Sequence, residues 1–215
     1  MSDLRARILA DVRATPSRTR QRERRRSTLL YCIAVAASAL LFFGTGGIVS
    51  GGRPMSFVFL TTASALVVGA LLVWLAGIQS RVMLGRSRSA LILGGLLAIG
   101  LLAVVPFVAI AQWIDSPAEA AGHYADVACG ALTFLQAAVP LLALMIWRSG
   151  TDPVHPGFTG AVLGGAAGAM AASMAYLRCP HTAMAHLLMA HVAPTIVLTG
   201  VGAVIGYFAL RLQRK

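Results

Sequence analysis

The sequence predicts an all-α fold: a polytopic bundle of six transmembrane helices with both termini in the cytoplasm. Three observations favour this fold. The 215 residues are 58% hydrophobic and only 12% charged, with a mean hydropathy of +0.78, whereas a soluble domain would carry roughly twice that charged fraction. The apolar residues form six long runs without Asp, Glu, Lys or Arg. The basic residues gather between alternate runs.

Each apolar run has roughly 20 or more residues, which is enough for a helix to cross about 30 Å of hydrocarbon. Helices are expected because lipid offers no hydrogen-bond partners to the backbone, and no ten-residue stretches of alternating hydrophobicity suggest a barrel. The last run is longer than needed, so its helix should tilt or project beyond the hydrocarbon. The expected spans are residues 28–49, 56–78, 90–112, 127–147, 157–177 and 184–210.

The basic residues predict the orientation. All of the 18 Lys and Arg residues except Arg53 and Arg178 lie in the N-terminal segment, the second and fourth connections and the C-terminal tail. Cytoplasmic segments carry this excess, so both termini should be cytoplasmic. The third connection, WIDSPAEAAGHYAD, has three acidic residues and no Lys or Arg, which suits the outer side. The net charge of +11 therefore reflects membrane topology, and no direct binding of nucleic acid is expected.

Three regions follow from this topology: a basic cytosolic segment at 1–27, a six-helix transmembrane domain at 28–211 and a cytosolic tail at 212–215. In the first region Leu4, Ile8 and Val12 share one face of a short helix that Pro16 should end, and a basic linker follows. The segment is either a topology signal that lies on anionic headgroups or a docking peptide for a cytosolic partner. The docking interpretation uses the apolar face together with Arg24, Arg25 and Arg26.

The fifth span is rich in glycine, and its small residues predict close helix packing. Small residues at four-residue spacing let helix backbones approach closely in lipid. A packing face within one chain is preferred to a homodimer face. The expected packing residues are Gly160, Gly164 and Gly168 in the fifth span and Gly202 and Gly206 in the last.

The spans also exclude several function classes. No Asp, Glu, Lys or Arg lies well inside any span, although ion pumps and proton relays usually need such groups at depth. The motifs of soluble zinc proteases, P-loop enzymes and serine hydrolases are absent, so no enzymatic activity is expected. Pro106, Pro140 and Pro194 are isolated kinks rather than paired breaks of an inverted-repeat transporter.

Cys129 and Cys179 should share a depth at the outer face, whereas Cys32 begins the first span on the cytoplasmic side. Three interpretations of the outer pair stay open. The cysteines are passive small hydrophobes, or they form a disulfide in an oxidising compartment, or they bind a soft metal or react as a thiol sensor, with His181 and His186 as further ligands. His181, His186 and His191 are spaced by five residues, about 140° apart on a helix, so the three cannot all face one ion and a closed tetrahedral site is not expected.

The C-terminal half resembles a known family. The features are CGALTFLQAAVPLLALMIWR from Cys129, the glycine-rich HPGFTGAVLGGAAGAMAASMAYLRCP that ends in Cys-Pro, the last span with MAHVAP, and a basic tail. This pattern is similar to the NrsF-type family of six-span bacterial inner-membrane proteins, which are regarded as anti-sigma factors for extracytoplasmic-function sigma factors. The first three spans match it in topology only.

The resemblance implies a function. The protein would sequester an extracytoplasmic-function sigma factor at the inner membrane and release it on heavy-metal or oxidative stress, sensed through Cys129 and Cys179. The implied partners are that sigma factor and the lipid bilayer, with no cofactor beyond a transiently bound soft metal ion. The alternatives are a small transporter or metal-efflux protein that uses the same cysteines, and a membrane scaffold in which they are passive.

Overall fold

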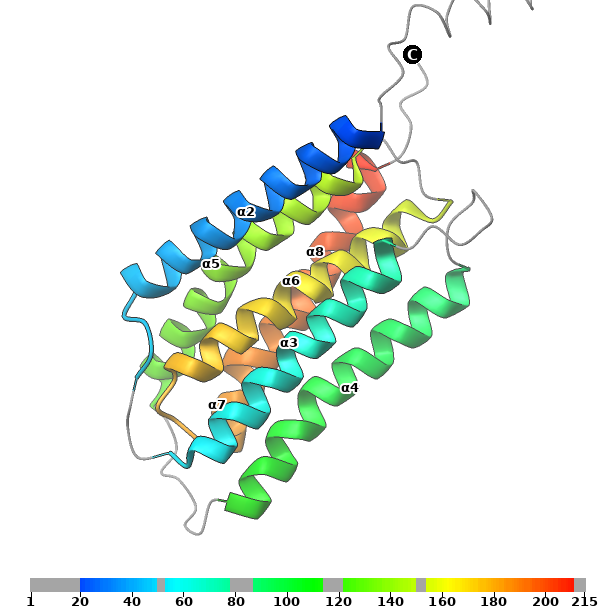
Figure 1. Ribbon diagram of the computed structural model, residues 1–215. Coiled ribbons are helices and arrows are strands. Elements are labelled where there is room, and N and C mark those ends of the chain that lie inside the picture. Colours follow the sequence, from blue (N-terminus) through cyan, green and yellow to red (C-terminus); the bar gives the residue numbers. More distant parts are fainter. Residues whose placement is uncertain (1–19, 50–52, 78–86, 114–121, 150–153, 211–215) are drawn as a thin grey trace, which may run out of the picture.

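The structure is a computed structural model, and it describes residues 20–49, 53–77, 87–113, 122–149 and 154–210. Every regular element in these ranges is helical, and six helices are long and apolar enough to cross a membrane, as predicted. The first helix begins and the last helix ends at the same end of the bundle (Figure 1). The helices are α2 (Arg20–Gly44), α3 (Met55–Gly77), α4 (Arg88–Trp113), α5 (His123–Arg148), α6 (Pro156–Arg178), α7 (Met184–Leu187), the π-helical η1 (Leu188–Val192) and α8 (Ala193–Ala209).

The first helix differs most from expectation. α2 begins at Arg20, so helix replaces the expected linker from that residue onward. The physical reason is that the stretch RQRERRR consists of good helix formers without Gly or Pro. α2 ends at Gly44 rather than near Val49, because Gly46 and Gly47 follow with positive φ values of 117° and 63°. The proposed docking residues Leu4, Ile8 and Val12 lie outside the described residues.

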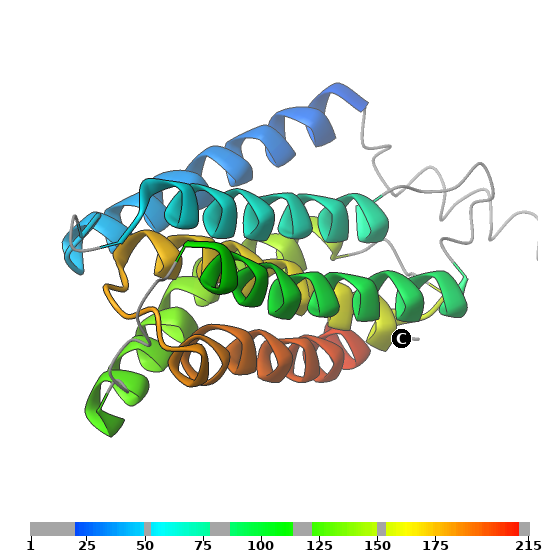
Figure 2. The same cartoon turned by 90° about the horizontal axis from the view of Figure 1, so that it is seen from below.

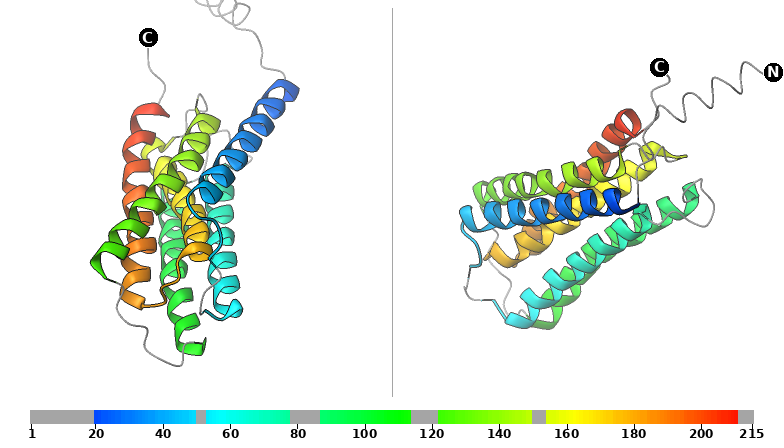
Figure 3. Two further views of the ribbon diagram at one scale, coloured as in Figure 1. Left: turned by 90° about the vertical axis from the view of Figure 1, so that its left-hand side faces the viewer. Right: turned by 45° about the horizontal axis from the view of Figure 1, so that its top comes forward.

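Helix α6 is the centre of the bundle. Inside its most apolar window, 78% of the residues are buried by protein, against 11% for the first span. It packs most extensively on α8 and then on α3 and α5, which surround it in the views of Figures 1 and 3. A helix that is covered on all sides by protein needs small side chains where neighbours approach, and the sequence of α6 supplies Gly and Ala there.

The closest approach lies between α6 and α8. A Cβ atom built on Gly160 would lie 2.6 Å from the Gly206 Cα and one on Gly168 would lie 2.8 Å from the Thr195 Cα. A Cβ on Gly164 would clash with the carbonyl oxygen of Leu198, and one on Gly202 would clash with that of Gly160. The two backbones therefore touch directly, and no side chain separates them.

Helix α2 is the least embedded helix. It packs mainly on α5 and lies at an angle to the rest of the bundle at its edge (Figures 2 and 3). An apolar groove of about 910 Å³ separates it from α3 and α6, with Ala34, Ser38 and Phe42 on its α2 wall and Met170 on the α6 wall. Few protein contacts hold α2 along its length, so its position depends on how its two ends are fixed.

The contact between α6 and α8 predicts a position-specific cost of added methyl groups. Gly164→Ala forces the two backbones apart, and overpacking of this kind typically costs about 1–3 kcal/mol. We expect thermal unfolding in detergent, followed by circular dichroism, to show a lower midpoint for Gly164→Ala. Gly200→Ala is the matched control, since a Cβ there meets nothing within 4 Å. Equal midpoints for the two variants would contradict the packing described.

Candidate functional site: a buried cluster of two cysteines and a histidine

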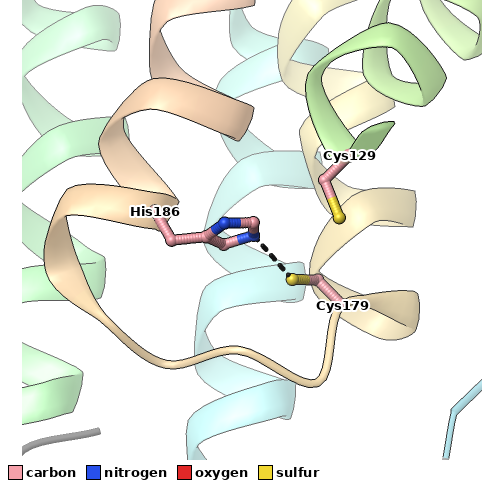
Figure 4. Close-up of side chains that lie close together, drawn as sticks. All are labelled: Cys129, Cys179 and His186. Atoms are coloured by element: carbon pink, nitrogen blue, oxygen red, sulfur yellow. Dashed lines mark hydrogen bonds between the residues drawn. The ribbon is translucent and has the colours of Figure 1, made fainter. Parts of the chain in front are cut away.

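Three segments that are distant in sequence bring their soft ligand atoms together at the end of the bundle opposite the start of α2. Cys129 lies in the second turn of α5, Cys179 caps the C-terminus of α6, and His186 lies in α7 after a short loop (Figure 4). The loop is short because α6 and the last helix are antiparallel neighbours. The ends of α5, α6 and α7 therefore meet at one depth, as the topology predicted for the two cysteines.

The cluster is compact and shielded. The Cys129 Sγ, Cys179 Sγ and one ring nitrogen of His186 all lie within 4.8 Å of one another. The Cys179 Sγ is 3.0 Å from the His186 Nε2, and Figure 4 shows both sulfur atoms on the side of the ring that carries this nitrogen. Cys179 and His186 are buried, at 3% and 1% exposure, and Cys129 is partly buried. The neighbouring Cys129 thiol and burial raise the pKa of the Cys179 thiol.

Asp126 fixes the orientation of His186. The Asp126 Oδ1 lies 2.5 Å from the His186 Nδ1. A carboxylate accepts a hydrogen bond, so this contact places the imidazole proton on Nδ1 and leaves the Nε2 lone pair facing the two sulfur atoms. Sequence reasoning treated Asp126 only as an outer-loop acid. Its spacing of three residues from Cys129, which puts both on one face of a helix, was the available signal.

A π-helical turn changes the expected arrangement of the histidines. The 140° separation assumed for His186 and His191 does not hold, because their rings are in contact. Only His186 joins the two cysteines, in line with the expectation that the three histidines do not all face one ion. In η1 the Ala193 N–H bonds to the Leu188 carbonyl, five residues earlier. The wider turn leaves the two rings in edge-to-face contact, with centroids 5.4 Å apart. His181 packs against the other side of His186 at 4.9 Å. It is not among the three residues whose ligand atoms converge.

Pro194 supplies the physical cause of this turn. Proline has no N–H, and its ring crowds the carbonyl four residues earlier, which is that of Ala190. The Thr133 hydroxyl of α5 lies 3.0 Å from the Ala190 oxygen and can donate the missing hydrogen bond. The same hydroxyl is 3.4 Å from the His191 Nδ1. Pro194 was the sequence signal for this irregularity, although alone it predicts only a kink.

Two arginines tie the cluster to the neighbouring helices. Arg178, adjacent to Cys179, donates to the Phe42 carbonyl of α2 at 2.9 Å and lies over the Phe42 ring. With the Gln136 amide oxygen turned toward it, Arg178 also donates to that oxygen at 2.6 Å. Arg53 donates to the Tyr176 carbonyl at 2.8 Å near the end of α6. Cations at a helix C-terminus are favourable because the last carbonyls lack partners.

The remaining predicted residues lie elsewhere. Gly160, Gly164, Gly168, Gly202 and Gly206 line the contact between α6 and α8. Arg25 and Arg26 are exposed on the second turn of α2, near the end of the bundle opposite the cluster, and the side chain of Arg24 lies outside the described part. Cys32 is exposed in the middle of α2. The structure therefore brings together Cys129, Cys179 and His186, and leaves Cys32 and the basic residues apart from them.

These features define a class: a multi-pass helical membrane protein with a soft-ligand cluster at one end of its bundle and basic residues at the other. A family model described as NrsF, negative regulator of sigma F, matches residues 10–212. The chain belongs to this family and is a negative regulator of a sigma factor, with a sigma factor as its partner. The resemblance seen in the C-terminal half thus extends over nearly the whole chain. No similar protein was found among curated sequences or solved structures.

The geometry predicts which cysteines can be joined. A disulfide needs its sulfur atoms about 2.05 Å apart, and the Cys129 and Cys179 sulfurs start within 4.8 Å. We expect the thiol oxidant diamide, which takes up two electrons and two protons, to form this bond within one chain. Peptide mass spectrometry would detect it, and Cys32→Ser should give the same product. A disulfide that contains Cys32, or none between Cys129 and Cys179, would contradict the arrangement.

Proposed function

We propose that this protein is an anti-sigma factor of the bacterial inner membrane that sequesters an extracytoplasmic-function sigma factor at its cytoplasmic face. Heavy-metal or oxidative stress, sensed at the outer face through Cys129 and Cys179, releases the sigma factor. The observation that carries the proposal is that the two cysteines converge at one end of a bundle whose other end carries the exposed basic residues. A signal on one side of the membrane can therefore act on a partner bound at the other.

The distribution of charge supports this orientation. Arg25 and Arg26 on α2, Arg88 at the start of α4 and Arg148 at the end of α5 lie at the end away from the cluster. At the cluster end, the arginines of the described chain bind backbone carbonyls. The positive-inside rule then favours a cytoplasmic location for the basic end. A basic N-terminal segment would also attract an acidic surface of a sigma factor and raise its association rate.

A route between the two ends runs through α2. Arg178 directly precedes Cys179 in the chain and donates to the Phe42 carbonyl in the last turn of α2. Because α2 is poorly embedded beside its groove, loss of this tether would change its position more than that of any helix packed around α6. α2 continues at its other end into the N-terminal segment, so a shift of the helix would move the docking residues. A stress signal needs only to favour one of two packings.

Retention of a sigma factor tests the function directly. Each extracytoplasmic-function sigma factor of the host is expressed with the full chain, and membranes are sedimented. We expect one of them to sediment with the protein and to lose transcription from its reporter promoter. Deleting residues 1–19 should return it to the soluble fraction, whereas a chain with Gly200→Ala should retain it. If no sigma factor is retained, or if retention survives alteration of every cytosolic segment, the proposal fails.

The cysteines provide the second arm of this test. We expect cadmium or diamide to switch the reporter on in cells with the wild-type chain. Cys129→Ser and Cys179→Ser should keep the sigma factor bound under the same stress, while Cys32→Ser should respond like wild type. Normal release in both outer-cysteine variants would show that the signal enters elsewhere.

The tether at Arg178 predicts constitutive release. Arg178→Gln removes a charged hydrogen bond to α2, an interaction worth about 1.5–3 kcal/mol. The population of the released state relative to the bound state should therefore rise roughly tenfold or more. Reporter activity without stress should rise accordingly at an unchanged amount of membrane protein. Arg88→Gln, which removes a cation–π contact with Phe158 at the opposite end, is the matched control. Equal reporter activity in the two variants would exclude the route through α2.

A further inference from the structure

We infer that Cys129, Cys179 and His186 coordinate a thiophilic divalent ion of the cadmium and zinc class directly, with Asp126 as the positioning residue for His186. The inference deepens the proposed function, and its regulatory consequence rests on it, because it names the ligand that the outer face would detect. The binding step itself can be measured on the isolated chain. The site has two sulfur donors and one imidazole nitrogen, and it leaves one coordination position open.

The distances suit coordination after small side-chain movements. Metal–sulfur bonds of about 2.3 Å and metal–nitrogen bonds of about 2.0–2.1 Å place the ligand atoms of a tetrahedral site roughly 3.4–3.8 Å apart. Here the three ligand atoms lie within 4.8 Å of one another, and the Cys179 Sγ and His186 Nε2 are 3.0 Å apart. An ion that enters would draw Cys129 inward and part the hydrogen-bonded pair. Side-chain rotation can supply these shifts of about 1 Å.

Asp126 makes His186 a preformed ligand. A histidine that binds a metal through one ring nitrogen almost always donates the other N–H to a carboxylate, a carbonyl or water. The Asp126 carboxylate occupies that position at Nδ1. The rings of His181 and His191 flank His186, so its plane is held from both sides. Nε2 therefore faces the sulfur atoms before any ion arrives.

Charge balance favours a divalent ion with these ligands. Two metal–sulfur bonds form as two S–H bonds break, and two protons leave for the solvent. Two thiolates with a neutral imidazole offset the two positive charges of the ion, so its binding adds no uncompensated charge at a buried site. Sulfur and imidazole donors select soft and borderline ions over magnesium and calcium, which prefer oxygen.

His186 also separates two kinds of stress. Oxidation to a disulfide requires only the two sulfur atoms, since each thiol gives one electron and one proton to the oxidant. Coordination requires the imidazole as well. A change at His186 or Asp126 should therefore weaken the response to cadmium and leave the response to diamide in place.

The test is a cadmium titration of the purified full-length chain in detergent, followed by the sulfur-to-cadmium charge-transfer absorption. Wild type should bind one ion per chain and release two protons. His186→Gln and Asp126→Asn should weaken binding by about 10–100-fold, the usual effect of losing such a ligand or its orienting partner. Cys32→Ser, which changes an exposed thiol outside the cluster, should bind within about threefold of wild type. Equal binding by His186→Gln and wild type, or an equal loss in Cys32→Ser, would overturn the assignment.

A measurement on the wild-type chain tests the site even where the variants do not fold. X-ray absorption of the cadmium complex should fit two sulfur neighbours together with nitrogen or oxygen. A shell of four sulfur atoms, or one without sulfur, would overturn the site. The reporter then separates the two proposals. Cadmium binding without release of any sigma factor would contradict the proposed function and support the metal site. Cadmium-induced release that persists in a His186→Gln chain with impaired binding would contradict the inference and support the proposed function.

Discussion

The direct backbone contact between α6 and α8 is the constraint on which the rest of this structure depends. In lipid, helices gain little from hiding apolar surface, so close packing must hold them together. Gly160, Gly164 and Gly202 let these two helices touch without side chains between them. That contact fixes the end of α6 relative to the start of the last helix. It therefore also fixes the distance between Cys179 and His186, which sit at those two ends.

Polar side chains inside the bundle concentrate toward the cluster end. Gln136, Thr133 and His191 are almost fully buried. A buried polar group costs free energy unless it is hydrogen-bonded, and Thr133 and Gln136 have partners in a carbonyl group and a guanidinium group. The same groups join α5 to the last helix and to Arg178. The half of the bundle that carries the cluster is thus held by directional hydrogen bonds, whereas α6 and α8 are held by close packing of small residues.

The sequence predicted the six spans because the length of an apolar run can be read from the sequence alone. It also placed Cys129 and Cys179 at one depth, since depth follows from position along a helix. It named His181 and His186 alike as further ligands and could not show that His186 is the one that joins the cysteines. That depends on the rotation of the last helix, which a single π turn alters, and on Asp126, whose role appears only when α5 meets α7. The helical start of α2 was missed because charge alone was read as a sign of a linker, although arginine and glutamine favour helix.

The position of His186 relative to the two cysteines depends on the number of residues in the π turn. In an α-helix each residue advances the side-chain direction by about 100°, so one residue more or less before α8 rotates everything upstream by that angle. The packing face of α8 against α6 would stay in phase, while His186 would swing away from the two sulfur atoms. Deletion of one residue within η1 would therefore separate the ligand set from the bundle. The register of a single turn decides whether this membrane protein carries a third soft ligand.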